Sequence, residues 1–306
     1  MNRPRKKNVI PDSRLRQLGG DVVYEIRCGV PGCTCSTPNV ACSRGFFSLF
    51  IQAINGIAFA KGFHLRWYVN YGHVSYAYSQ PGNPDRNFWN YYFDQPIRDG
   101  NSLNLLPNDV IETYPLMIWD RDFIRNLGEV MKQELVYKDE VKASFEALKT
   151  KFKGHKVLGV HIRRTDHAIE TEPVEVDEYI SEINKRISRF DKIFLATDDQ
   201  AVAAKFKELY GDKLWLNDVS RSNDGQAVHE NETMTNKYQL GLDALADCYA
   251  LSLSDESLLY HSNLSYAALL FNPELKYKLM ERASTKRKRL LTLSLYYLDK
   301  WNIRKW

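Results

Sequence analysis

The stretch VLGVHIRRTDH, residues 157–167, decides the fold of this chain. Its first six residues form an apolar, β-favouring run of the kind found in strands buried on both faces. Arg163 and Arg164 follow directly. Open parallel sheets bind ligands at the carboxyl ends of their strands, where guanidinium groups suit phosphate oxygens. The stretch therefore predicts a strand that brings two arginines to an anionic ligand. The alternative is a surface arginine pair held by acids such as Asp166.

The chain after this stretch alternates between apolar runs and segments with helical spacing. We expect strands at 157–162, 192–198, 214–218 and 257–261, and helices at 177–190, 199–211, 236–254 and 264–271. Asp177 is the expected N-cap of the first helix, and Asp198 and Asp199 are the expected caps of the second. Strands that alternate with helices form parallel sheets covered on both faces. The second half is therefore predicted to be a doubly wound α/β domain.

The first half is less regular. We expect strands at 21–28 and 65–71, and helices at 45–62, 123–136 and 138–152. A polar stretch, KTKFKGHK (149–156), separates the two halves. The sequence thus predicts two Rossmann-like α/β domains facing a cleft: residues 1–153, which would bind the acceptor, and residues 154–306, which would bind the nucleotide. The last helix could cross back onto the first domain.

The amino-acid composition limits the classes of protein to which this chain could belong. The 306 residues are 44% hydrophobic, which provides for buried cores in about two domains. The net charge of +4 suits an anionic ligand but is too small to predict nucleic-acid binding. No segment approaches the ~18 consecutive apolar residues of a membrane-spanning helix, and the basic N-terminus has no apolar stretch after it. We therefore expect a cytoplasmic protein.

Three further segments leave alternatives open. The C-terminal segment 284–306 is basic and aromatic, so it could lie peripherally on a membrane surface or pack as a helix on the first domain. The sequence WDRD (119–122) could bind a metal, but we interpret it as a helix start. The clustered cysteines are interpreted as reduced thiols, with zinc or disulfides as alternatives. They are Cys28, Cys33, Cys35 and Cys42.

The strand-end motifs carry a resemblance. GVHIRRTD (159–166) resembles the first signature of the α-1,6-fucosyltransferases, which include the nodulation enzymes. IFLATDD (193–199) is similar to the second block, and the stretch from Asp247 to SNLS (262–265) is similar to the third. A weaker similarity lies in Ser43–Phe47, which opens a helix. The resemblance implies a GT-B-type inverting glycosyltransferase that moves L-fucose from GDP-fucose to a glycan or glycolipid acceptor, without a metal or cofactor.

The resemblance also implies roles for single residues. Arg163 matches the arginine expected on the donor's β-phosphate. Asn263 departs from the longer enzymes, which have a serine there, but an amide can still donate to a phosphate. The residues expected to bind the donor are His161, Arg163, Arg164, Asp166, Asp198, Asp247, Ser262, Asn263 and Ser265.

The catalytic base is not fixed by the sequence. An inverting transfer needs a carboxylate or histidine that takes the proton of the acceptor hydroxyl. Asp166, His167, Glu170 and Glu172 all follow the arginines closely. The family has a glutamate at a position that Glu170 and Glu172 bracket, and we favour Glu170. The expected catalytic residues are thus Arg163, Glu170 and Glu172. Two other functions stay open: transfer of another nucleotide-activated sugar, and non-catalytic binding of a sugar or nucleotide.

Overall fold

The computed structural model describes residues 12–18, 22–28, 42, 44–96, 103–105, 117–164, 173–223, 225, 236–301 and 303. The chain forms two compact units. The first unit comprises Met1–Lys138 and Leu291–Trp306, and the second comprises Asp139–Leu290. The division thus precedes helix α5 (Asp139–Phe152), whereas the sequence suggested a boundary after it. Within the second unit, Phe145 of α5 stacks on Tyr249 with ring centroids 3.9 Å apart.

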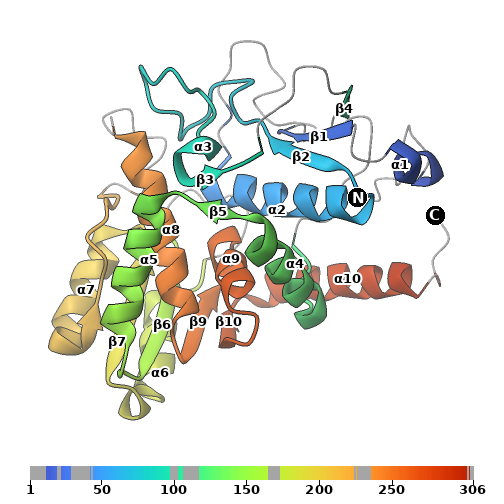
Figure 1. Ribbon diagram of the computed structural model, residues 1–306. Coiled ribbons are helices and arrows are strands. Elements are labelled where there is room, and N and C mark those ends of the chain that lie inside the picture. The colour runs from blue at the N-terminus through green and yellow to red at the C-terminus, as the bar shows by residue number, and fades with distance from the viewer. Residues whose placement is uncertain are drawn as a thin grey trace. The chain divides into compact units, whose positions relative to one another are not determined.

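A parallel sheet of five strands forms the second unit (Figure 1). The strands are β6 (Val157–Ile162), β7 (Lys192–Thr197), β8 (Leu214–Trp215), β9 (Glu256–Tyr260) and β10 (Lys276–Met280). They lie in the order β10-β9-β6-β7-β8. The chain proceeds outward from β6 to β8, then returns to the other side of β6. The order therefore reverses between β6 and β9, and open sheets bind ligands outside the carboxyl ends of strands at such a reversal.

Helices cover both faces of this sheet. They are α6 (Val176–Asn184), α7 (Gln200–Tyr210), α8 (Lys237–Ser252) and α9 (Asn263–Phe271). Leu158 and Val160 of β6 lie in one core with residues of α6 and α7. The alternate residue His161 contacts Ser265 of α9 on the opposite face. Because β6 is buried on both faces, its sequence is a continuous apolar run. The predicted doubly wound α/β domain is confirmed.

Some element boundaries differ from the prediction. Glu175, and not Asp177, is the N-cap of α6, and the carboxylate of Glu178 accepts the backbone N–H of Glu175 at 3.3 Å. Helix α6 ends at Asn184 and is followed by a 3₁₀ turn, η4 (Ile187–Arg189). Strand β10 was not predicted, because exposed residues alternate with partly covered ones along this edge strand and no apolar run marks it.

The first unit contains a second parallel sheet, in the order β2-β1-β4. Its elements are α1 (Asp12–Leu18), β1 (Val22–Ile26), α2 (Phe46–Gly62), β2 (Arg66–Val69), α3 (Trp89–Tyr92), β3 (Phe93–Asp94), β4 (Leu103–Leu105), α4 (Arg121–Glu134) and β5 (Val136–Tyr137). The carboxylate of Asp120 accepts the N–H of Phe123 at 2.9 Å and caps α4. The interpretation of WDRD as a helix start is confirmed.

Two of the four clustered cysteines lie among the described residues. Cys28 and Cys42 are buried, and their Sγ atoms lie 4.0 Å apart. The guanidinium of Arg44 donates to the Sγ of Cys28 at 3.4 Å. Cys33 and Cys35 fall outside the described residues. In the part of the chain that the structure describes, no group of three or more His, Cys, Asp or Glu side chains could hold a metal ion.

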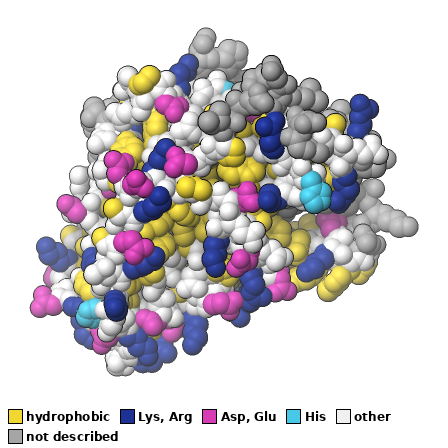
Figure 2. Space-filling view, in the orientation of Figure 1, with side chains coloured by type: hydrophobic (Ala, Val, Ile, Leu, Met, Phe, Trp, Pro, Cys, Tyr) yellow, Lys and Arg dark blue, Asp and Glu magenta, His cyan; other side chains and the backbone are white. Residues whose placement is uncertain are grey.

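Two further predictions concern the distribution of basic residues on the surface and the place of the last helix. On the face that Figure 2 shows, Lys and Arg side chains alternate with Asp and Glu side chains and form no continuous basic area. Helix α10 (Ala283–Lys300) begins in the second unit, and its residues from Leu291 onward belong to the first. Among the helices built from described residues, none combines the length and the hydropathy needed to cross a bilayer.

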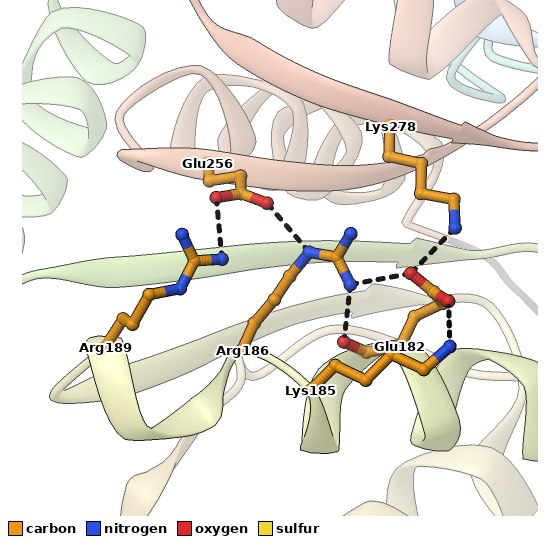
Figure 3. Close-up of polar contacts among 6 residues, drawn as sticks. All are labelled: Glu182, Lys185, Arg186, Arg189, Glu256 and Lys278. Carbon is orange, nitrogen blue, oxygen red and sulfur yellow. Dashed lines mark hydrogen bonds and ion pairs between the residues drawn. The ribbon is translucent and has the colours of Figure 1, made fainter.

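An ion-pair network fastens α6 to the edge of the five-stranded sheet (Figure 3). Its members are Glu182, Lys185, Arg186, Arg189, Glu256 and Lys278. Glu182 accepts from Lys185 and Arg186 at 2.6 Å and from Lys278 at 2.7 Å. The hydrogen bonds from Lys185, Lys278 and Arg186 lower the pKa of Glu182 from 4.5 to about 2.

We predict that this network makes stability depend on pH. Because the folded pKa of Glu182 lies below its ordinary value, the stabilisation is present above about pH 4.5 and lost as the pH falls towards 2. Glu182→Gln should lower the free energy of unfolding at neutral pH by about 1–2 kcal/mol, after allowance for solvent screening. The deficit should shrink in acid. Urea unfolding across this pH range measures both effects.

Glu146→Gln is the matched control, since Glu146 forms an exposed pair with Lys149 at 2.6 Å on α5. Its effect should stay below about 0.5 kcal/mol. Equal effects of the two substitutions at neutral pH would contradict the assigned role of the network.

Candidate functional site

The candidate site lies where the strand order of the second unit reverses. β6 ends at Ile162 and leads to Arg163, while β9 ends at Tyr260 and leads to the start of α9 at Asn263. The two strands are parallel neighbours, with Leu158 opposite Glu256. Their carboxyl ends therefore lie at the same edge of the sheet, and the arginines and the N-terminus of α9 flank the reversal point.

A buried polar contact joins these two strand ends. The Nδ1 of His161 is hydrogen-bonded to the Oγ of Ser265 at 2.7 Å and lies 3.4 Å from the Oγ of Ser262. Ser262 is the N-cap of α9, and its Oγ accepts the N–H of Ser265 at 3.2 Å. The predicted capping by Ser262 is confirmed. Ser265 is fully buried, so in this structure its hydroxyl holds His161 and thereby fixes β6 against α9.

The end of the neighbouring strand β7 supplies an acid for the arginines. The carboxylate of Asp198 accepts the backbone N–H of Arg164 at 3.0 Å, and its other oxygen lies 3.9 Å from the Nε of Arg163. The latter distance is the outer limit of an ion pair and too long for a hydrogen bond. Both side chains of the pair are 24% exposed. The acid beside Arg163 in the described structure is therefore Asp198, and the pair lies at the edge of the sheet.

The prediction that Asp198 and Asp199 both cap α7 is wrong for Asp198. Asp199 is the N-cap and accepts the N–H of Val202 at 3.0 Å. Only one residue can occupy this position, and Asp198 precedes it. The carboxylate of Asp198 instead receives the N–H of Arg164, so it connects β7 to the arginines.

Arg164 points towards the segment that precedes α6. Its Nη1 lies 3.5 Å from the carbonyl oxygen of Val174 and 3.9 Å from a carboxylate oxygen of Glu175. The Arg164 side chain is 30% exposed. The two arginines therefore leave the strand end in different local environments, and both keep part of their surface in contact with solvent.

Asp247 lies near the end of β8. It is buried on α8 and accepts a hydrogen bond from the Nδ2 of Asn217 at 2.8 Å. Burial raises the pKa of Asp247 to about 7, although the bond from Asn217 and the nearby charge of Arg221 oppose this rise. The sequence analysis missed Asn217 and Arg221. Asn217 lay within the predicted strand 214–218, and Arg221 lay in the polar segment that follows it.

Part of the predicted site falls outside the described residues. This holds for Asp166, His167, Glu170 and Glu172, which follow the arginines in the chain. Their expected roles stay predictions. The described part already contains two guanidinium groups and the N-terminus of the nine-residue helix α9. Helix N-termini and arginines are both suited to anions, so this edge of the sheet could hold a phosphate or diphosphate.

Sequence comparisons identify no relatives. No protein family matches the chain, and no curated protein matches it.

Comparison of structures does find similar folds. The fucosyltransferase NodZ from Bradyrhizobium aligns with a TM-score of 0.50 and 16% identity, over 86% of this chain and 96% of that chain. A crystal of NodZ α-1,6-fucosyltransferase soaked with GDP-fucose gives a TM-score of 0.50 and 15% identity, over 86% and 95% of the two chains. Likeness at this identity concerns the fold. The chain has the α/β fold of the GT-B type that the sequence predicted.

We predict that Asp247→Asn stabilises the protein above neutral pH. The folded pKa of Asp247, about 7, exceeds its ordinary value of 3.8, so the native state binds the proton more tightly. Asn is neutral at every pH and can still accept from Asn217. The gain should be absent below about pH 4, grow as the pH rises, and level off above about pH 7 at about 1–3 kcal/mol.

Urea unfolding at several pH values measures this gain. The control is Asp177→Asn, because the Asp177 side chain is 83% exposed and pairs only with Lys205 in the described structure. It should change stability little at any pH. A loss of stability in Asp247→Asn above pH 7 would contradict the prediction.

Proposed function

We propose that the protein is an inverting glycosyltransferase that moves L-fucose from GDP-fucose to a glycan or glycolipid acceptor. One observation carries the proposal: Arg163 and the N-terminus of α9 flank the reversal of strand order between β6 and β9. Two kinds of anion-binding group thus meet at the place where open parallel sheets bind ligands. The fold shared with NodZ, which has been soaked with GDP-fucose as a crystal, supports the choice of donor.

In the proposed complex, the diphosphate lies between the ends of β6 and β9. Arg163 would contact the β-phosphate through its planar guanidinium, and Arg164 would add a second positive charge. The first turn of α9, beginning at Asn263, would direct backbone N–H groups at the phosphate oxygens. Asp247 would bind the guanosine, and Asp166 would complete the donor site. These assignments combine the observed strand ends with the resemblance of the motifs.

Other residues would hold the two arginines and the start of α9 in place. His161 is held by Ser265 and lies two residues before Arg163, so their contact fixes the strand end relative to α9. Asp198 holds the backbone of Arg164. Preorganised charges stabilise a transition state more than charges that must first reorganise. The first unit would bind the acceptor.

The proposed reaction is a single displacement. The acceptor hydroxyl oxygen bonds to the anomeric carbon of fucose while the bond from that carbon to the β-phosphate oxygen breaks, and GDP leaves. The hydroxyl proton passes to a carboxylate, for which Glu170 is our first choice and Glu172 the second. Negative charge grows on the leaving diphosphate, and the arginines and the start of α9 stabilise it. The proposal requires no metal for this step.

A donor screen tests the proposed function. We predict that the purified protein hydrolyses or transfers from GDP-fucose faster than from other GDP-sugars and UDP-sugars, and that EDTA leaves the activity intact. Preference for another donor would favour the alternative transferase on the same fold. Nucleotide binding without turnover of any donor would favour the non-catalytic alternative. Loss of activity in EDTA, with recovery in manganese, would contradict the metal-free step.

We predict that Arg163→Lys lowers kcat/KM about 100-fold or more, because lysine retains the charge but lacks the planar fork of donors. The melting temperature should change little, since lysine keeps the positive charge and the Arg163 side chain is partly exposed. The control is Arg189→Lys, the same change in an exposed side chain that pairs with Glu256 at 3.2 Å. Activity equal to wild type in Arg163→Lys would remove the arginine from the proposed mechanism.

We predict that Glu170→Gln abolishes transfer and preserves GDP binding, because the amide cannot accept the acceptor proton while the diphosphate contacts are made elsewhere. Transfer assays and calorimetric titration with GDP measure the two effects. Glu172→Gln is the paired variant. If that variant alone loses transfer, the base is Glu172. If both variants transfer normally, the role falls to Asp166 or His167, or to no residue of this segment.

A further inference from the structure

Helix α10 carries apolar side chains that the rest of the chain leaves accessible. It is the red helix in Figure 1. Its residues include Leu290, Leu291, Leu293, Leu295, Leu298, Tyr296 and Tyr297, yet Thr285 is its only buried residue. Leu291 is 60% exposed, and Trp301 and Ile303, which follow the helix, are 62% and 66% exposed. Exposed apolar residues concentrated on one segment indicate an interaction surface.

The spacing of these residues defines one outward face. Arg287, Leu290, Leu291, Leu298 and Trp301 recur at intervals of three, four or seven, so they lie along one side of a helix. We call these five residues the outward stripe.

The opposite side of α10 is turned towards the protein. Thr285 is buried, and Arg289 pairs with Glu281 at 2.7 Å. Farther along, Tyr296 packs edge-on against Phe123 with ring centroids 5.6 Å apart. The helix is therefore held by one side within each unit, and the leucines of the outward stripe are left on the other.

Basic residues surround the outward stripe. Residues 283–306 contain seven Lys or Arg and a single acid, Asp299. Lys286, Arg287 and Lys288 are all exposed and precede the leucines, and Lys300 is exposed beside Trp301. An apolar stripe with Trp at its end and Lys and Arg at its margins is typical of helices that lie in the interface of an anionic membrane.

We propose that the outward stripe of α10 docks on a membrane surface that contains anionic lipids. The leucines and Trp301 would enter the boundary between headgroups and acyl chains, while Lys286 and Lys288 would contact lipid phosphates. A second copy of this chain would fit the outward stripe less well than an anionic membrane would. Two stripes brought together would place basic segments against each other whichever way the helices ran, and like charges repel. The proposal does not depend on the proposed transferase activity.

Vesicle flotation tests the proposal on the full chain. The probes are vesicles of phosphatidylcholine alone and vesicles that also contain phosphatidylglycerol. We expect binding to the anionic vesicles, loss of most binding at high salt, and a blue shift of tryptophan fluorescence on binding. The double variant Leu291→Glu, Trp301→Glu should lower the partition coefficient at least about tenfold, since both side chains are exposed and must enter the lipid.

Leu209→Glu is the control, because Leu209 is 51% exposed on α7. It should bind as the wild type does. Circular dichroism should show all variants folded. Three results would overturn the proposal: no binding to anionic vesicles, equal binding by the double variant and the wild type, or self-association of the wild type that the double variant abolishes without any vesicle binding.

Discussion

The reversal of strand order between β6 and β9 is the constraint on which the candidate site depends. All five strands of the sheet are parallel, so their carboxyl ends meet at one edge, and the chain crosses from one side of β6 to the other only once. Residues far apart in sequence thereby become neighbours. Asp198 after β7 receives the N–H of Arg164 after β6, and Ser265 of α9 holds His161. A change in strand order would disperse all four.

The charged residues of the second unit lie in three different environments: an ion-pair network, the carboxyl edge of the sheet, and a buried position on α8. Around Glu182 and Glu256 each carboxylate has two or three cationic partners at 2.6–3.2 Å, and the result is attachment of α6 to the sheet. At the carboxyl edge, the Nε of Arg163 lies 3.9 Å from a carboxylate oxygen of Asp198. Asp247 is buried with a pKa raised to about 7, which disfavours its charged form.

The fold persists where sequence similarity does not. The chain matches no family by sequence, yet aligns with NodZ over 86% of its length at 16% identity. Cores tolerate extensive exchange among apolar residues when volume and pattern are kept. In this chain, β6 combines an apolar run with a small residue, Gly159, and Arg163 follows the strand. A Cβ at Gly159 would lie 2.4 Å from the Oγ of Ser257 on β9 and 2.7 Å from the Oγ of Ser254, so a larger residue here would force these buried side chains to move.

The amino-acid sequence by itself determined most helices and strands of the second unit. It also determined the edge of the sheet at which the candidate site lies. Periodicity suffices for this, because a doubly covered sheet needs continuous apolar strands and helices with one apolar face. It predicted β6 over 157–162, placed Arg163 at its end, and identified Ser262 and Asp120 as caps. Local pattern was insufficient for β10, an edge strand in which exposed lysines interrupt the apolar residues. It was also insufficient for the cap of α6, because Glu175 is not one of the residue types preferred at N-caps, whereas Asp177 is.

Only the tertiary structure decided which polar residues meet. Sequence spacing could not show that His161 bonds to Ser265 across 104 residues, or that Asp198 holds Arg164 and leaves the capping of α7 to Asp199. It also gave no sign that Asn217, beside the end of β8, donates a hydrogen bond to Asp247. The exposure of the outward stripe of α10 also depends on the tertiary structure, because the same leucines could equally have been buried in a core. Long-range contacts depend on strand order and layer assignment, and both are properties of the assembled sheet.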